Sequence, residues 1–283
     1  MTLRAGRVFL ASFVLLLCTT VLYASETIVP DSSLTPTTSL YTNNYGNIVL
    51  TTGGGNANGV GDPSGRNDDG FSGPINLGFT LSLYGTNYTS FFINNNGNVS
   101  FGSGIADYTP NGPTGANAPI ISPFFADVDT RNPASGVVQF NQIMSGSTVV
   151  ADVITWPSVG YFSEEANELD TFQLVLLNPS LPIPTGEGNI GFFWNTMQWE
   201  VGGASGGVNG FCPAGTAGVS CFPAAVGFGD GMGNEEVLQG SLQSGISGIV
   251  NDEELWFNSS GNGNPTPVGT VPEPGSVFLI GSG

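Results

Sequence analysis

Residues 75–102 read I-N-L-G-F-T-L-S-L-Y-G-T-N-Y-T-S-F-F-I-N-N-N-G-N-V-S-F-G, and this stretch decides the fold class. Apolar side chains alternate with polar ones from Ile75 to Leu83, which is the period of a half-buried β-strand. A second apolar run leads into the turn signal Asn94–Gly97, because Asn and Gly tolerate the positive φ angles of a tight hairpin. The stretch therefore predicts antiparallel strands joined by short turns.

Short apolar runs of this kind recur along the chain, separated by Gly, Asn, Pro or Ser. They predict an all-β fold: an antiparallel β-sandwich or barrel-like sheet packing with long Gly/Asn-rich loops and little helix. Residues 53–70 are expected to form a long surface loop, and Glu164–Leu169 is the one short helix expected. The expected strands are Asn47–Thr51, Ile75–Leu83, Thr89–Asn94, Asn98–Gly102, Ile120–Val128, Gly136–Ile143, Thr148–Trp156, Thr171–Asn178, Asn189–Asn195, Ala225–Gly229 and Glu254–Phe257.

The composition removes most catalytic classes. The 283 residues include four arginines, no lysine, no histidine and 22 acidic residues, for a formal net charge of -18. Without His or Lys there is no Ser-His-Asp or Cys-His nucleophile system, no HExxH zinc site and no Schiff base. Nucleic acid and anionic lipid are poor partners, because both bind clustered cations. An acidic, lightly charged surface suits a secreted protein, with divalent cations or carbohydrate as ligands.

The start of the chain is typical of a secretory signal peptide over residues 1–24. Arg4 and Arg7 provide a positive region, an apolar stretch follows, and Ala24 is the expected cleavage point. These features predict export.

The end of the chain resembles the PEP-type C-terminal sorting signal of bacterial exported proteins. Pro272-Glu273-Pro274 precedes a short apolar run, as in that signal, but the run ends at Gly283 without a basic tail. The signal is therefore expected to be truncated or degenerate. The resemblance implies a sortase-like processing enzyme as a partner and transient anchoring at the cell surface.

Several strings in the middle of the chain carry a family resemblance. The strings are I-N-N-N-G-N-V-S-F-G at 93–102, I-I-S-P-F-F-A-D-V-D-T-R at 120–131, A-D-V-I-T-W-P-S-V-G-Y-F-S-E-E-A-N-E-L-D-T-F-Q-L-V-L-L at 151–177, N-I-G-F-F-W-N-T-M-Q-W-E-V-G-G-A-S-G-G at 189–207 and A-V-G-F-G-D-G at 225–231. In this order and spacing they resemble the nidogen-like extracellular (NIDO) domain, a module of nidogen, of tectorin-like and mucin-like proteins and of bacterial secreted proteins. The resemblance covers about Ile75 to Phe257.

This resemblance gives the expected domain organisation and function. It implies a secreted or cell-surface, non-enzymatic adhesion or matrix module that binds an extracellular protein or polysaccharide. A carbohydrate-active enzyme using only carboxylates, and a structural component of the exopolysaccharide matrix, are the alternatives. The expected segments are the signal peptide at 1–24, an N-terminal extension and loop contributing strands at 25–74, the nidogen-like domain at 75–257, a flexible linker at 258–270 and the partial sorting signal at 271–283.

Asp127, Asp129 and Arg131 form the main candidate site. Their spacing of two places them on one face of an extended strand end. One interpretation is a structural ion pair of Asp129 with Arg131, which ties the strand to a loop. The other is a Ca²⁺ site at Asp127 and Asp129, because hard cations take several oxygen ligands.

Two further groups of acidic residues allow weaker interpretations. Asp62, Asp68 and Asp69 lie in a Gly-rich loop and are expected to be solvated turn residues, with a loop cation site as the alternative. The acidic segment 164–170 contains Glu164, Glu165, Glu168 and Asp170. It is expected to be a solvated loop, with a glycoside-hydrolysing carboxylate pair as the alternative.

Cys212 and Cys221 flank a short Gly/Ala-rich loop, and in an exported chain they are expected to form a disulfide. A metal pair there would lack His and further Cys ligands. The four tryptophans, Trp156, Trp194, Trp199 and Trp256, lie in or beside apolar runs. They are expected in the core, with stacking on a sugar ring as the alternative.

Overall fold

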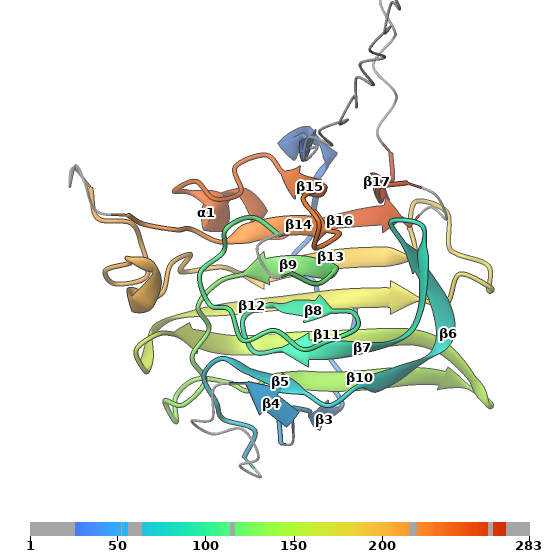
Figure 1. The fold of residues 1–283 in the computed structure, drawn as a ribbon, viewed down its shortest axis with the longest axis horizontal. Coiled ribbons are helices and arrows are strands. Elements are labelled where there is room, and N and C mark those ends of the chain that lie inside the picture. Colours follow the sequence, from blue (N-terminus) through green and yellow to red (C-terminus); the bar gives the residue numbers. More distant parts are fainter. Residues whose placement is uncertain are drawn as a thin grey trace, which may run out of the picture.

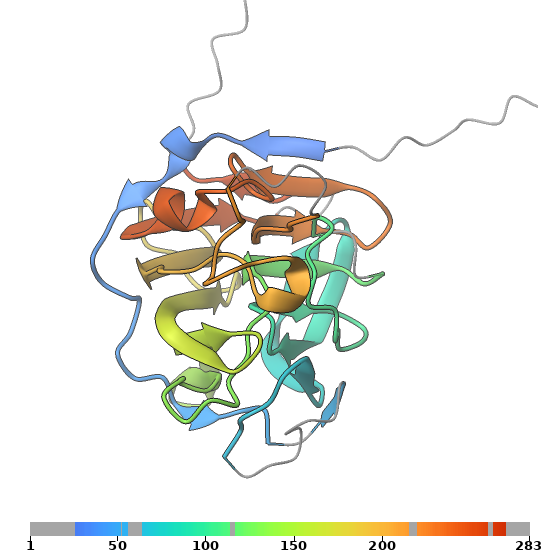
Figure 2. The same ribbon diagram turned by 90° about the vertical axis from the view of Figure 1, so that its left-hand side faces the viewer.

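Two β-sheets lie face to face in the computed structural model, which describes residues 26–51, 53–55, 64–113, 117–214, 220–259 and 263–269. Figure 1 looks onto the sheets and Figure 2 shows them edge-on as two layers. This arrangement confirms the predicted all-β fold in its sandwich form. The signal peptide with Ala24, and the Pro272-Glu273-Pro274 motif, lie outside the described residues and stay predictions.

The first sheet has nine strands in the order β1-β15-β14-β9-β8-β7-β5-β4, with β6 paired to β7. Its pairs are antiparallel except that β1 runs parallel to β15. The strands are β1 (Glu26–Val29), β4 (Gly53–Gly55), β5 (Gly70–Ser72), β6 (Ile75–Leu83), β7 (Thr86–Asn94), β8 (Asn98–Ser100), β9 (Ile120–Phe125), β14 (Ala225–Gly229) and β15 (Glu235–Leu238).

The second sheet has eight strands in the order β17-β16-β13-β12-β11-β10-β3, with β2 paired to β16, and all of its pairs are antiparallel. The strands are β2 (Thr35–Pro36), β3 (Asn47–Ile48), β10 (Gln139–Ser145), β11 (Thr148–Tyr161), β12 (Glu165–Leu177), β13 (Ile190–Thr196), β16 (Glu253–Asn258) and β17 (Thr266–Pro267). The described residues also contain three short helices: η1 (Asp31–Ser33), η2 (Gly203–Ser205) and α1 (Ile246–Val250).

Aromatic side chains dominate the core between the sheets. Trp156, Trp194 and Trp199 are fully buried, and the Trp156 ring stacks on Phe172 with 5.0 Å between centroids. Burial of one large apolar side chain contributes roughly 3 kcal/mol before entropy costs. Trp256 is 6% exposed and packs on the outer face of the second sheet. The predicted core role of the four tryptophans is confirmed.

The N-terminal segment connects the two sheets and then covers the outer face of the second one (Figure 2, blue). Between β2 and β3 it crosses that sheet strand by strand. The Asn195 side chain donates to the Thr38 carbonyl over 2.7 Å, and Gln173 exchanges hydrogen bonds with the Thr42 backbone. The Tyr41 ring contacts Phe193 and Trp256 at centroid distances of 5.8 and 6.1 Å. The segment therefore completes a second apolar cluster.

Local expectations were wrong in two places. Glu164–Leu169 is not a helix; from Glu165 onward it is the start of β12, which pairs with β11 as far as Tyr161 opposite Glu165. Sheet pairing overrides the weak local helix propensity. Residues 53–70 are not simply a surface loop, because they contribute β4 and their last residues are buried.

Two features concern the ends of the described chain. The stretch 258–270, expected to be a flexible linker, contributes β17 to the edge of the second sheet by pairing with β16. No helix in the described parts of the chain is long and apolar enough to cross a membrane.

Candidate metal centre

Asp127 and Asp129 follow β9 and are almost fully buried, at 1% and 0% exposure. Arg131 donates from Nε to Asp129 Oδ1 over 2.9 Å and from Nη2 to Asp129 Oδ2 over 2.5 Å. The Glu164 backbone N–H also donates to Asp129 Oδ2 over 2.8 Å. Asp129 therefore has donors for both carboxylate oxygens. Arg131 pairs with Asp129 and makes no ion pair with Asp127, although the three residues alternate along the chain.

Asp68 and Asp69, expected to be solvated turn residues, are buried at 4% and 6% exposure. Asp68 forms a backbone bridge with Asp129, and its Oδ2 lies 3.0 Å from Arg131 Nη2. Asp69 Oδ1 accepts a hydrogen bond from Asn96 Nδ2 over 2.8 Å. The expectation was wrong because pairing with the end of β9, far along the chain, draws this segment into the molecule. Asp62 lies outside the described residues.

Arg66 and Asn67 hold this segment in place. The Arg66 guanidinium donates to the backbone carbonyls of Thr130, Asn132 and Ser135 over 2.7 to 2.9 Å, and to that of Pro133 over 3.1 Å. Asn67 and Thr130 exchange hydrogen bonds in which each acts as donor and acceptor. Arg66 is therefore committed to carbonyl oxygens and neutralises none of the nearby carboxylates.

The hairpin between β7 and β8 forms one wall of the site. The sequence predicted this turn, and Asn94 pairs with Asn98 across it. Asn96 accepts the Val128 N–H over 2.9 Å, while the Asn95 amide donates to the Val128 carbonyl. Gly97 has φ +73, and a Cβ there would lie 1.8 Å from the Phe124 carbonyl oxygen. Asparagine side chains therefore fix the strand end, a role that turn propensity alone does not reveal.

The η2 segment lies against Asp127. The Ala204 backbone donates a hydrogen bond to the Asp127 carboxylate. A Cβ at Gly202 would lie 2.5 Å from Asp127 Oδ2, so only glycine allows this approach. The Phe162 N–H donates to the Asp127 carbonyl, and the Gly203 N–H donates to the Phe162 carbonyl. Two segments distant in sequence therefore contact Asp127, residues 202–204 at its side chain and Phe162 at its backbone.

Three carboxylates converge in this enclosure. One oxygen each from Asp68, Asp69 and Asp127 lies within 4.8 Å of the others. Burial, and then the charges of Asp69 and Asp68, raise the pKa of Asp127 to about 8. Burial, and then the charges of Asp69 and Asp129, raise the pKa of Asp68 to about 7, against the lowering effect of Arg131. Oxygen ligands in a buried anionic cluster suit a hard cation.

The predicted disulfide is confirmed. Cys212 and Cys221 are bonded, with 5.8 Å between their Cα atoms. The segment around this disulfide packs on η2, since the Phe222 N–H donates to the Ser205 carbonyl over 2.9 Å. Val208, Phe211 and Phe222 in the same segment are exposed at 59%, 42% and 37%. The disulfide therefore braces a surface segment rich in exposed apolar side chains, next to the acidic cluster.

The acidic segment 164–170 divides in two. Glu164 and Glu165 are exposed, in agreement with a solvated stretch. Asp170 is fully buried, contrary to that expectation, and its Oδ1 accepts the N–H groups of Gln198 and Trp199. Burial raises the pKa of Asp170 well above its usual value. Strand β12 turns inward along its length, so its first acids reach solvent while Asp170 reaches the core.

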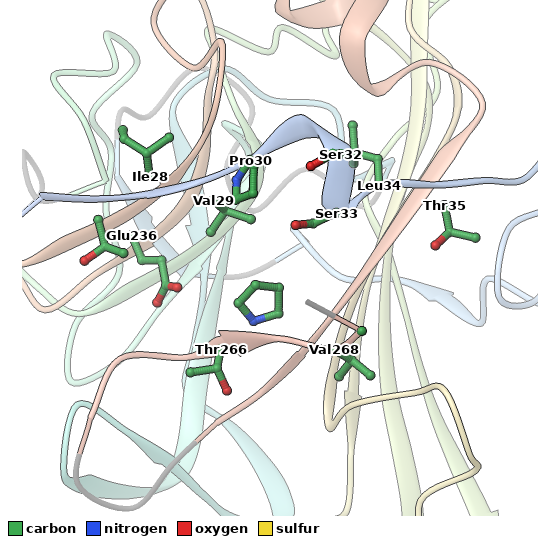
Figure 3. Close-up of a pocket in the computed structure, with 13 residues that line it drawn as sticks. Ile28, Val29, Pro30, Ser32, Ser33, Leu34, Thr35, Glu236, Thr266 and Val268 are labelled. Carbon is green, nitrogen blue, oxygen red and sulfur yellow. The ribbon is translucent and has the colours of Figure 1, made fainter. Parts of the chain in front are cut away.

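A separate groove of about 670 Å³ lies where the N-terminal segment passes between the sheets (Figure 3). None of the clustered aspartates lines it. Its one acidic side chain is Glu236, whose pKa burial raises to about 7. No local pattern indicates this groove, because residues 27–35 and 266–269, which line most of it, meet only in the folded chain.

The two-layer all-β fold with this aspartate-rich strand end defines the class of a β-sandwich module. The chain matches the family model described as NIDO related over residues 37–183, slightly more than half of its length. It therefore belongs to the NIDO-related family, and the nidogen-like resemblance is confirmed. The matched residues include most of the N-terminal segment that covers the second sheet, the residues Asp68, Asp69 and Asp127, and the long β11–β12 hairpin.

Comparison with individual proteins agrees with this family. The chain is similar to alpha-tectorin from Mus musculus, at 28% identity over 162 residues, and from Homo sapiens, at 26% over 162 residues. Alpha-tectorin from Gallus gallus is 27% identical over 161 residues. Each match covers 50% of this chain but 7% of the tectorin. No solved structure matched the chain.

Proposed function

We propose that this chain is an exported, non-enzymatic adhesion or matrix module that binds an extracellular protein. Membership of the NIDO-related family carries the proposal, together with the similarity to alpha-tectorin over half of the chain. The absence of His and Lys from the sequence supports a binding role over most catalytic ones. Bacterial origin, export through the N-terminal signal and processing by a sortase-like enzyme belong to the same proposal and rest on the sequence motifs.

The binding surface that we propose is the disulfide-braced segment, residues 203–214 and 220–222. Exposed apolar side chains that are held in place mark interaction sites, because little entropy is lost when they bind. Val208 and Phe211 exchange backbone hydrogen bonds of 2.8 and 3.2 Å, and the disulfide closes the segment nearby. The four tryptophans are buried and therefore offer no indole face to a sugar ring, which favours a protein over a polysaccharide.

Biolayer interferometry on the full chain tests this proposal. The immobilised chain is probed separately with the secreted proteins and with the purified exopolysaccharide of the source culture. Phe211→Ser should weaken protein binding at least about tenfold, as loss of an aromatic anchor costs more than 1 kcal/mol. Met232→Ser is the matched control, since Met232 is 85% exposed but lies between β14 and β15. Binding of polysaccharide alone, or equal binding by both variants, contradicts the proposed surface.

The carbohydrate-active alternative needs two carboxylates that flank an accessible glycosidic bond. In the acidic segment 164–170, where this carboxylate pair was expected, Glu164 and Glu165 are exposed, but Asp170 is fully buried and accepts two backbone N–H groups, which favours the non-enzymatic function. Release of reducing sugar from the source exopolysaccharide, abolished by Glu165→Gln, would establish the alternative instead.

A further inference from the structure

We propose that Asp68, Asp69 and Asp127 bind one Ca²⁺ ion between the end of β9, the segment before β5 and the η2 segment. Asp129, which the strand spacing also suggested as a ligand, is not part of this site because Arg131 and the Glu164 N–H satisfy its oxygens. The inference does not depend on the adhesion function proposed above.

The distances fit calcium. Ca²⁺ binds oxygen at roughly 2.3–2.6 Å, so two oxygens on one ion lie at most about 5 Å apart. One oxygen from each of the three aspartates lies within 4.8 Å of the others. The three carboxylates can therefore contact one ion without rearrangement of the backbone.

Two carboxylate oxygens in the cluster lack a donor. Asp127 Oδ2 and Asp68 Oδ1 are buried and accept no hydrogen bond from the described residues. Asp127 itself is 1% exposed and Asp68 is 4% exposed. A buried carboxylate oxygen without a donor costs free energy, because it has lost its water and gained nothing in return. A cation placed among these oxygens removes that cost.

The charge balance also favours a cation from outside the chain whenever the cluster is ionised. The fully ionised cluster of four aspartates, Asp129 included, has four negative charges, and Arg131 supplies one positive charge. In the described part of the chain the other arginine is Arg66, whose guanidinium is bound to carbonyl oxygens. The sequence has no Lys or His. Three charges remain uncompensated, and Ca²⁺ reduces them to one.

The site would connect parts that the sheets leave separate. Asp68 and Asp69 precede β5, whereas Asp127 lies under η2, which in turn carries the disulfide-braced segment. Bound Ca²⁺ would therefore fix the position of that segment relative to the first sheet. The affinity expected is that of extracellular calcium modules, with a Kd of roughly 0.1–1 mM.

Thermal unfolding of the full chain tests the inference. After EDTA treatment and dialysis, about 10 mM CaCl₂ at neutral pH should raise Tm by about 3–10 °C, as expected for this affinity and chain length. MgCl₂ should have a smaller effect, because Mg²⁺ demands a tighter octahedral shell. A calcium shift below about 1 °C overturns the inference.

Two isosteric variants and one control locate the site. Asp127→Asn and Asp69→Asn should each abolish the calcium shift. Asp152→Asn is the matched control, since Asp152 is fully buried and has a raised pKa but lies elsewhere, in β11. An unchanged calcium shift in both cluster variants contradicts the assignment.

Equilibrium dialysis with ⁴⁵Ca²⁺ keeps the inference testable if the variants fail to fold. The wild-type chain should bind one calcium ion with a Kd in the expected range. Absence of bound calcium means that protons neutralise the cluster instead, and the inference fails.

Discussion

Glu200 and Asp127 are each 1% exposed, yet their carboxylates have opposite surroundings. Both oxygens of Glu200 accept the Gly245 N–H over 2.9 Å, and Oε2 also accepts the N–H and hydroxyl of Ser247 at the start of α1. Asp127 faces Asp68 and Asp69, and its Oδ2 has no donor among the described residues. The described chain therefore supplies donors to both carboxylate oxygens of Glu200 but leaves one carboxylate oxygen of Asp127 without a donor.

The difference shows that burial alone does not assign a role to an acidic residue. A carboxylate surrounded by N–H and O–H donors is stabilised in its charged form and connects two segments of the fold. A carboxylate surrounded by other carboxylates holds a proton or needs a cation. Arg131 donates to both carboxylate oxygens of Asp129 but contacts only one oxygen of Asp68. Asp68 is therefore intermediate between the two cases.

Removal of Arg131 should have the largest effect. Arg131→Met leaves Asp129 buried without its cation, and loss of one partner of a buried pair costs about 3–5 kcal/mol. Urea unfolding of the wild type and the variant measures this loss. Arg66→Met is the control, because it leaves carbonyl oxygens rather than a carboxylate unpaired and should cost less. Equal losses would show that Arg131 does not compensate the cluster.

Glu200→Gln should have the next largest effect, about 2–3 kcal/mol in the free energy of unfolding. The amide places its NH₂ group against the donors of Gly245 and Ser247, which leaves buried polar groups unsatisfied. Glu165→Gln, at an exposed position, should stay within about 0.5 kcal/mol of the wild type. Denaturant unfolding of the wild type and both variants measures these changes. If Glu200→Gln left the free energy of unfolding unchanged, the contrast with Asp127 would not hold.

Substitution of Asp152 should have the smallest effect on the free energy of unfolding, and this effect should depend on pH. Its Oδ1 accepts from Gln142 over 2.9 Å, and burial raises its pKa to about 7. The folded state therefore keeps a proton that the unfolded state releases from about pH 4 upward, so stability falls as pH rises through this window to about 7.

Asp152→Asn removes this titration, and it should reduce the loss of unfolding free energy between about pH 5 and 8 by about 2 kcal/mol. Chemical unfolding of EDTA-treated protein at both pH values measures the change. Glu165→Gln, which replaces an exposed carboxylate, again serves as the control. If Asp152→Asn has the pH dependence of the wild type, Asp152 is charged in the folded protein.

Strands with a clear apolar pattern were predictable because their signal is local. Ile75–Leu83 and Ala225–Gly229 were predicted with the bounds that the structure has. The edge strand β1 and its neighbour β15 were missed, since Glu26–Val29 and Glu235–Leu238 are short and β15 begins with two glutamates. Edge strands depend on a partner far along the chain, which no local pattern encodes.

The candidate site was predictable only in part. The strand-end spacing pointed to Asp127, Asp129 and Arg131, and the Asp129–Arg131 contact follows that spacing. Asp68 and Asp69 were read as solvated because Gly, Asn and Asp surround them in sequence. Their burial depends on Asn67 bonding to Thr130 and Asp68 bridging to Asp129, which are contacts across about sixty residues.

The sequence by itself determined that this is an acidic all-β chain with two cysteines suited to a disulfide, because strand period, turn residues and composition are local or additive properties. It also determined that no lysine or histidine can neutralise a buried acid. Only the tertiary structure decided which acids are buried together, and which of them find donors. The physical reason is that desolvation and Coulomb interactions depend on distances in space, and Asp69 and Asp127 approach only when the two sheets and their loops have packed.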